Sequence, residues 1–123
     1  MLKILISTVI SILLISCNNK TITNNYPNGN IMEQFTSKEG KKNGEYKSYY
    51  ETGKLRETAT YQDDDYIGKR TLYFENGNID TEENYSKPGI LNGEYKIYYK
   101  EGGIQVVKNY NENILSGLMT VYY

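Results

Sequence analysis

The sequence predicts an all-β protein, built as one elongated single-layer antiparallel sheet of about eight strands made of repeated hairpins. The main observation is a fixed spacing of glycines, which lie 24, 24 and 25 residues apart at Gly29, Gly53, Gly77 and Gly102. A second series keeps the same step at Gly44, Gly68, Gly93 and Gly117. Between the glycines, apolar and polar residues alternate as they do in strands. A fixed period of this length indicates a repeat architecture.

The period divides the chain into four units, residues 26–49, 50–73, 74–98 and 99–122. Each unit begins at an aromatic residue and passes through a glycine turn, a strand, a polar loop and a second strand that ends in tyrosine. We therefore expect strands at residues 30–36, 44–50, 54–61, 68–74, 78–85, 93–99, 103–110 and 117–123. Loops at 62–67, 86–92 and 111–116 would join the hairpins.

The turns at the first glycine series set the expected register. Asn28-Gly29 and Asn76-Gly77 are typical of two-residue type I′ turns, and the repeat puts Thr52-Gly53 and Glu101-Gly102 in the same place. Two-residue turns would pair an aromatic with an aliphatic residue beside each turn: Tyr50 with Leu55, Phe74 with Ile79, and Tyr99 with Ile104. They would also pair a glycine with a ring, at Gly44 and Tyr61, Gly68 and Tyr85, and Gly93 and Tyr110, and would oppose Arg70 to Glu83.

Residues 1–16 are expected to be a cleaved signal peptide that forms a helix. Met1-Leu2-Lys3 gives a cationic start, and the run from Ile4 to Ile15 is mostly apolar. As a helix this run would be about 18 Å long, which is too short for a bilayer core of about 30 Å.

Cys17 is the only cysteine, so the chain cannot form an internal disulfide. The preceding Leu14-Ile15-Ser16 resembles the lipobox of bacterial lipoproteins, which implies cleavage before Cys17 and acylation of that residue. The protein would then be held on a membrane of the bacterial cell envelope. Residues 18–25 are polar and favour a tether between the lipid and the repeats, with a first edge strand as the alternative.

The composition limits the classes of function. Residues 17–123 contain all 15 acidic residues and 13 basic ones, a net charge of −2 with no basic stripe, which argues against a nucleic-acid partner. The chain has no histidine and no tryptophan, but it has 14 tyrosines, all after residue 17. Such a chain can build a thin sheet covered by amphipathic rings better than a thick aliphatic core.

The repeat itself resembles a known family. Gly44-Glu45-Tyr46-Lys47-Ser48-Tyr49-Tyr50, and its counterpart at residues 93–99, are similar to the bacterial variant of the MORN repeat, and the resemblance extends over residues 26–123. Arg70, Met119 and Ser37 depart from the pattern. The resemblance implies a row of hairpins in one antiparallel sheet. Many such bacterial proteins are labelled YwqK-family antitoxins, and eukaryotic relatives act in protein-binding and membrane-linked scaffolds.

The best candidate site is a row of tyrosines one repeat apart, at Tyr49, Tyr73, Tyr98 and Tyr122. Alternation puts these rings on one face of the sheet. They either stabilise the sheet by cross-strand packing or form a recognition surface, because tyrosine is enriched at interfaces.

The sequence gives little support for a cofactor, a metal or an enzyme activity. Asp63-Asp64-Asp65 could in principle hold calcium, but it lacks the spacing of an EF-hand loop and is better explained as a solvated loop. The carboxylates of Glu57, Asp80, Glu82 and Glu83 could form a glycosidase pair, but a single-layer sheet offers no deep pocket to raise one pKa.

We therefore expect a non-enzymatic, membrane-anchored module that binds a protein. Two alternatives remain open: neutralisation of a toxin, as the family label suggests, and binding of cell-wall carbohydrate through the tyrosine rings. Self-association through the edge strand at residues 117–123 is a further expectation.

Overall fold

The computed structural model describes residues 18–123, and these residues form one sheet of 12 strands. Eight strands are long: β1 (Asn19–Asn25), β2 (Ile31–Lys38), β3 (Lys41–Tyr49), β4 (Leu55–Gln62), β6 (Gly68–Tyr73), β7 (Ile79–Lys87), β9 (Gly93–Tyr98) and β10 (Ile104–Asn111). Four have two residues each: β5 (Asp65–Tyr66), β8 (Ile90–Leu91), β11 (Ile114–Leu115) and β12 (Thr120–Val121). The expected signal peptide with its helix, and Cys17, lie outside the described residues.

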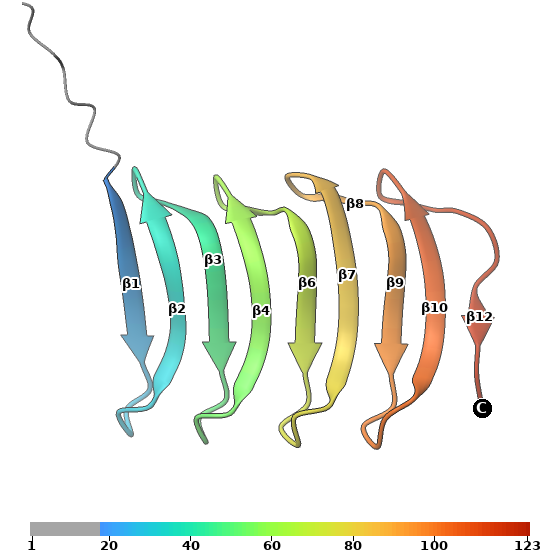
Figure 1. Cartoon of the computed structure of the whole chain (residues 1–123), viewed down its shortest axis with the longest axis horizontal. Helices are drawn as coiled ribbons and strands as arrows, with labels where there is room; N and C mark the ends of the chain where they lie inside the picture. The colour runs from blue at the N-terminus through green and yellow to red at the C-terminus, as the bar shows by residue number, and fades with distance from the viewer. Residues whose placement is uncertain (1–17) are drawn as a thin grey trace, which may run out of the picture.

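The strands lie side by side in a single layer that is longest across the strands (Figure 1). Their order is β1-β2-β3-β4-β6-β7-β9-β10-β11, with β5 beside β4, β8 beside β7 and β12 beside β10. The pairings are antiparallel throughout. Residues 18–123 contain no helix. The predicted fold class, an open antiparallel sheet of repeated hairpins, is confirmed.

Seven of the eight expected strands form close to their predicted bounds, and the eighth is much shorter. Of residues 117–123, only Thr120 and Val121 pair with β10. This segment has a neighbouring strand on one side only, and its side chains find little to pack against, since Leu118 is 89% exposed. The expected edge strand is therefore reduced to β12.

The expected tether at residues 18–25 is wrong for nearly its whole length. Asn19–Asn25 is β1, which pairs with β2 over the length of the strand. The pairing satisfies main-chain groups that β2 would otherwise expose at an edge. Ile22 lies opposite Phe35 in the register, and the Asn24 side chain donates a hydrogen bond of 2.8 Å to Glu33. The edge strand, which was the alternative, is the correct interpretation.

The glycine turns at one edge of the sheet, here called the turn edge, are longer than predicted. The Gly53 N–H donates to the Tyr50 carbonyl (2.8 Å), and the Tyr50 N–H donates to the Lys54 carbonyl (2.8 Å). Gly53 alone has positive φ (88°), so this is a three-residue turn closed by a glycine bulge, not a type I′ turn. Gly29, Gly77 and Gly102 close the same bonding pattern.

Asparagine side chains reinforce two of these four turns. The Asn28 carboxamide oxygen accepts the Asn30 N–H (2.9 Å), and its amide donates to the Glu51 carbonyl in the next turn (3.0 Å). Asn76 bonds in the same way to Asn78 and Lys100. Positive φ at the asparagine is therefore not needed to close these turns.

The three-residue turn also changes the register beside each turn, and a second irregularity, between Ser48 and Tyr49 in the hairpin of β3 and β4, restores the predicted register further along the strands. Away from the turns the predicted pairs are confirmed, for example Gly44 with Tyr61 and Ser48 with Glu57. Beside the turn, Leu55 pairs with Tyr49 and not with Tyr50. Ile79 and Ile104 shift in the same way, to Tyr73 and Tyr98. A covering ring does not explain why glycine stands opposite tyrosine. At Gly68, for example, an added Cβ would meet no atom within 4 Å, and the positive φ of 70° is what favours glycine there.

The opposite edge, here called the loop edge, contains turns with two central residues of positive φ: Glu39-Gly40, Asp63-Asp64 and Glu112-Asn113. Each loop is bonded to a neighbouring repeat. Asp64 donates its N–H to the Lys42 carbonyl (3.0 Å), and its carboxylate accepts the Lys42 N–H (2.7 Å). Asn113 and Leu91 exchange the same two bonds. These reciprocal bonds hold neighbouring hairpins together along the loop edge.

Along the turn edge, tyrosine hydroxyls connect successive hairpins. The hydroxyls of Tyr26, Tyr50 and Tyr99 donate to the carbonyls of Tyr49, Tyr73 and Tyr122, over 2.9, 2.6 and 2.7 Å. Phe74 occupies the equivalent position in the remaining repeat and has no hydroxyl to donate. The sheet is therefore held across its repeats at both edges, with one bond of the series missing.

Candidate functional site

The structure places the four predicted tyrosines on one face and near the turn edge. Tyr49, Tyr73 and Tyr98 end strands β3, β6 and β9, and Tyr122 follows β12. The first three rings are half-buried, and Tyr122 is exposed. The ring contacts found among residues 18–123 join other tyrosines, so the predicted row is not a stack of rings.

Aliphatic residues fill the positions beside these tyrosines. Leu55, Ile79 and Ile104 are the cross-strand partners of Tyr49, Tyr73 and Tyr98. Leu55 also lines a shallow, mainly apolar hollow with Tyr73, the tyrosine of the next repeat. Rings and aliphatic side chains thus alternate across the sheet, and we call this surface the apolar stripe: Tyr49, Leu55, Tyr73, Ile79, Tyr98, Ile104 and Tyr122.

The aliphatic members of the stripe were missed because a two-residue turn assigns them to the other face. A one-residue change of register reverses the face of a side chain, and the bulge supplies that change. The available signal was the glycine three residues after each aromatic, which is typical of a three-residue turn closed by a glycine.

A polar row borders the stripe on the same face. The Tyr98 hydroxyl donates to the Glu82 carboxylate (2.6 Å), and Lys69 forms an ion pair with the same carboxylate. Burial, together with the nearby charge of Glu82, raises the pKa of Tyr98 to about 12. Hydrogen bonds from Lys69 and Tyr98 lower the pKa of Glu82. The hydroxyl of Tyr98 is thereby fixed, while its ring remains part of the stripe.

The opposite face, here called the ring face, holds the aromatic contacts of the sheet. The rings of Tyr46, Tyr61, Tyr66 and Tyr85 follow one another with centroid distances of 5.2, 4.6 and 5.5 Å. The Lys42 ammonium lies 4.5 Å from the Tyr46 ring centroid, in a cation–π contact. Burial raises the pKa of Tyr46 to about 12. The continuous ring row is therefore formed by other tyrosines than the predicted four, on the opposite face of the sheet.

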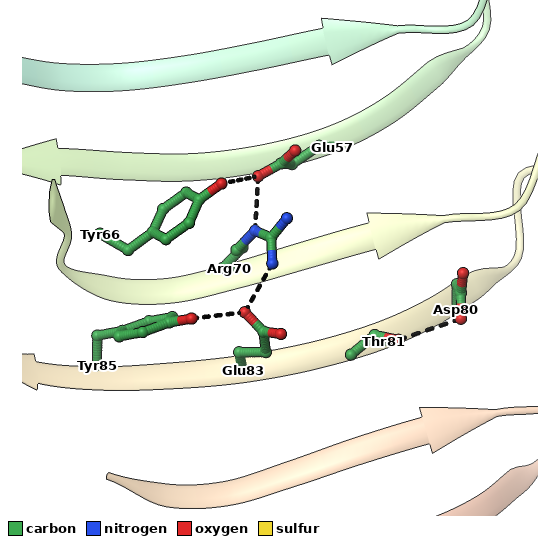
Figure 2. Close-up of polar contacts among 7 residues, drawn as sticks. All are labelled: Glu57, Tyr66, Arg70, Asp80, Thr81, Glu83 and Tyr85. Carbon is green, nitrogen blue, oxygen red and sulfur yellow. Dashed lines mark hydrogen bonds and ion pairs between the residues drawn. The ribbon is translucent and has the colours of Figure 1, made fainter. Parts of the chain in front are cut away.

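An ion cluster lies at the centre of the ring face (Figure 2). Arg70 donates to Glu57 (2.6 Å) and to Glu83 (2.9 Å), which joins three neighbouring strands, β4, β6 and β7. Tyr66 and Tyr85 each donate a hydroxyl to one of these carboxylates. Burial alone would lower the pKa of Arg70, but the bonds and charges of the two glutamates raise it.

Most of the carboxylates considered for catalysis are held in ion pairs. Two of the four carboxylates considered for glycoside hydrolysis, Glu57 and Glu83, pair with one guanidinium, while Glu82 is paired with Lys69 on the other face. Within residues 18–123, no group of three or more histidine, cysteine or acidic side chains is placed to hold a metal ion. Asp63 and Asp64 instead bond to the neighbouring loop.

An open single sheet of repeated hairpins is an elongated repeat scaffold, a class that presents extended binding surfaces. The family model described as MORN repeat variant matches residues 42–63, 66–87 and 91–112, more than half of the chain. The protein therefore belongs to the MORN repeat variant family. MORN repeats are generally associated with binding to proteins or membranes. No curated protein matches the sequence.

The matched segments have a clear structural meaning. They begin 24 and 25 residues apart, and each one covers a hairpin around Gly53, Gly77 or Gly102. The hairpin of β1 and β2 lies outside the match but has the same turn at Gly29. In the part of the chain that the structure describes, no helix is long and apolar enough to cross a bilayer.

Proposed function

We propose that this protein is a non-enzymatic lipoprotein of the bacterial cell envelope, and that its apolar stripe binds a protein partner. The observation that supports this most directly is the alternation of tyrosine and aliphatic side chains on one exposed face. In the proposal, residues 1–16 are removed as a signal peptide and Cys17 is acylated. The sheet is then a binding module on a membrane anchor.

The shape and composition of the stripe favour a protein over a small molecule. The stripe crosses six strands from β3 to β10, which at about 4.8 Å between strands gives a length near 24 Å. It is shallow, whereas small ligands are bound in enclosed clefts. Tyrosine rings beside aliphatic side chains, bordered by paired charges, are the composition of a protein interface with an apolar centre and a polar rim.

The partner-binding role can be tested by site-specific photocrosslinking in living cells. A photoreactive phenylalanine analogue replaces Tyr73 on the stripe or, as the matched control, Tyr95 on the ring face; both rings are half-buried. We expect a discrete adduct with a protein from position 73 and none from position 95. An adduct from position 95 and none from position 73 would show that the partner binds to the ring face, and would contradict a role for the apolar stripe.

A second variant measures the contribution of the stripe to affinity. Leu55→Lys and Ile79→Lys put charges into the apolar surface while leaving the tyrosine hydroxyl bonds in place. Once the crosslinked partner is identified, we expect its affinity for this double variant to fall by at least about tenfold, since central apolar contacts dominate interface energies. Thermal unfolding monitored by circular dichroism shows whether the variant still folds. Unchanged affinity in a folded variant would exclude the stripe as the binding surface.

The anchor has its own test. Cys17→Ala removes the only thiol of the chain, and we expect it to abolish metabolic labelling with a fatty acid and retention in the membrane fraction. Full retention of the Cys17→Ala chain on membranes would contradict lipidation.

A further inference from the structure

Three lysines gather at the corner of the sheet where the described chain begins. Lys20 is the second residue of β1, Lys38 ends β2 and Lys41 begins β3. Lys20 pairs with Ser37, next to Lys38, and Lys38 pairs in turn with Lys41, so the backbones of the three lysines lie within about two strand spacings, near 10 Å. Alternation places Lys20 on the face opposite to Lys38 and Lys41, at the same corner. All three are exposed. We call this group the basic corner.

The basic corner is not neutralised by its own chain. Among residues 18–123, Lys42 is paired with Glu33, whereas no ion pair involves any of the three corner lysines. Lys38 and Lys41 are direct cross-strand partners, an arrangement of like charges that destabilises a sheet. Glu39 is the one acidic residue in the turn between them. The fold therefore keeps a repulsive pair that an anionic surface would relieve.

The rest of the loop edge has the opposite charge. Asp63, Asp64 and Asp65 occupy the next loop, and Glu112 lies further along the edge, where it is bridged to Lys87 over 3.3 Å. Along the rest of this edge Lys69 and Lys87 are each paired with a glutamate, so among the described residues the lysines outside ion pairs at the loop edge are those of the corner beside β1. An anionic surface would attract that corner and repel the remainder of the edge.

We propose that the basic corner binds the headgroups of anionic phospholipids, and so sets the orientation of the sheet on its membrane. This inference rests on the proposed anchoring at Cys17. Because β1 begins at Asn19, only Asn18 separates Cys17 from the sheet, and the strand begins at the loop edge (Figure 1). The acyl chains and the corner lysines would therefore meet the bilayer together. Each lysine near an anionic surface shifts such an equilibrium by roughly fivefold.

The orientation has a consequence for the apolar stripe. β1 runs from the loop edge to the turn edge (Figure 1), a length of about 23 Å for seven residues. With the basic corner on the bilayer, the turn edge and the stripe beside it point away from the lipid. The membrane would present the stripe to partners in the aqueous compartment and would not cover it.

Fluorescence quenching in vesicles can test this orientation. Cys17 is the only native cysteine, and in the acylated chain its thiol is blocked. A thiol-reactive dye therefore attaches only to a cysteine that is introduced elsewhere. Ser37→Cys labels the partner position of Lys20, and Glu51→Cys labels the turn edge. The acylated chain is placed in vesicles of phosphatidylglycerol and phosphatidylethanolamine that contain a lipid with a nitroxide on its headgroup. We expect strong quenching at residue 37 and weak quenching at residue 51.

Two sets of charge variants distinguish the effect of the corner lysines on the orientation from that of the acyl anchor. Lys20→Gln, Lys38→Gln and Lys41→Gln together should remove the difference in quenching, as should vesicles of phosphatidylcholine alone. The matched control, Lys47→Gln with Lys54→Gln and Lys100→Gln, carries the same change of charge away from the corner and should keep the difference. An acylated chain quenched equally at residues 37 and 51 overturns the orientation only. A chain whose Cys17 is not acylated overturns the proposed anchoring as well.

Discussion

Arg70 is the single residue on which the ring face depends most. Its guanidinium is 19% exposed and lies between two carboxylates that are 9 and 10% exposed. Removing one partner of a buried ion group leaves uncompensated charge, which costs about 3–5 kcal/mol. We expect Arg70→Met to lower the free energy of unfolding by that amount in urea titrations.

The matched control for Arg70→Met also removes the charges of the two carboxylates that lose their partner. Adding Glu57→Gln and Glu83→Gln to Arg70→Met should recover most of the lost stability, because neutral amides of similar size replace the two carboxylates. If Arg70→Met alone changes the unfolding free energy by less than about 0.5 kcal/mol, the cluster has no structural role.

Phe74 offers a test in the stabilising direction. It occupies the place where Tyr26, Tyr50 and Tyr99 donate a hydroxyl to the next hairpin. We expect Phe74→Tyr to bond to the Tyr98 carbonyl and to raise the free energy of unfolding by about 0.5–1.5 kcal/mol. Phe35→Tyr, outside this series, is the control and should bring no gain. A destabilised Phe74→Tyr protein would show that the added hydroxyl does not fit.

At this scale the sequence predicts contacts within a hairpin better than contacts between hairpins. The opposition of Arg70 and Glu83 follows from the turn at Gly77 and is confirmed. The bond from Arg70 to Glu57 crosses from β6 to β4, where no tight turn fixes the register. Tyr66 belongs to the two-residue strand β5, in a segment predicted to be a loop, so alternation along the predicted strands could not assign its ring to the ring face.

Among the elements, the loop-edge turns combine strain with compensation. Asp64 has φ of 73°, a backbone conformation that side chains other than asparagine and glycine adopt at a cost, and it exchanges two bonds with Lys42. Asp64→Asn can keep the side-chain bond and tolerates the positive φ, so it should leave the free energy of unfolding nearly unchanged. Asp64→Gly loses the side-chain bond but relieves strain, whereas Asp64→Ala loses the bond and keeps the strain.

The stability of these three Asp64 variants should therefore fall in the order asparagine, glycine, alanine, with alanine about 1–3 kcal/mol below the native protein. Urea titration of each variant measures this directly. If alanine proves more stable than glycine, backbone strain at residue 64 is not significant. Hydrogen exchange should also show faster opening of the Lys42 N–H in both variants that lack the bond.

The type of each turn is the feature of the strands and turns that the sequence predicts least well. Asn76-Gly77 has the sequence of a type I′ turn, yet the Asn76 side chain bonds to the neighbouring turn and only Gly77 has positive φ. Asp63-Asp64, a poor sequence for such a turn, adopts positive φ at both residues because the adjacent loop supplies the bonds. Partners from the next repeat decide both cases, and local sequence does not contain them. For the same reason β1 was only the alternative for residues 18–25, since its stability comes from the edge of β2.

Across the whole molecule, a single layer stabilises itself with tyrosine rings and hydrogen bonds more than with an enclosed apolar core. Among residues 18–123, the apolar side chains exposed by less than a tenth are Tyr46 and Ala59 alone, and no side chain is fully enclosed. The repeat period and the abundance of tyrosine allowed this to be predicted. Which face the aliphatic residues beside each turn would occupy could not be predicted, because it depends on a shift of register next to the turn. Stability consequently depends on whether the phenols remain neutral.

Alkaline pH should therefore destabilise the sheet. Burial raises the pKa of Tyr46 and Tyr98 to about 12, from an ordinary value of 10.0, and also raises the pKa of Tyr61 and Tyr85. Between pH 10 and 12 the unfolded chain loses these protons while the folded chain keeps them. The stability present below pH 10 is then lost as the pH rises. The urea midpoint, followed together with phenolate absorbance, measures this loss, and Tyr98→Phe should reduce its slope. A midpoint that stays constant up to pH 12 would mean that the rings ionise freely in the folded sheet, and that packing of neutral phenols does not hold it together.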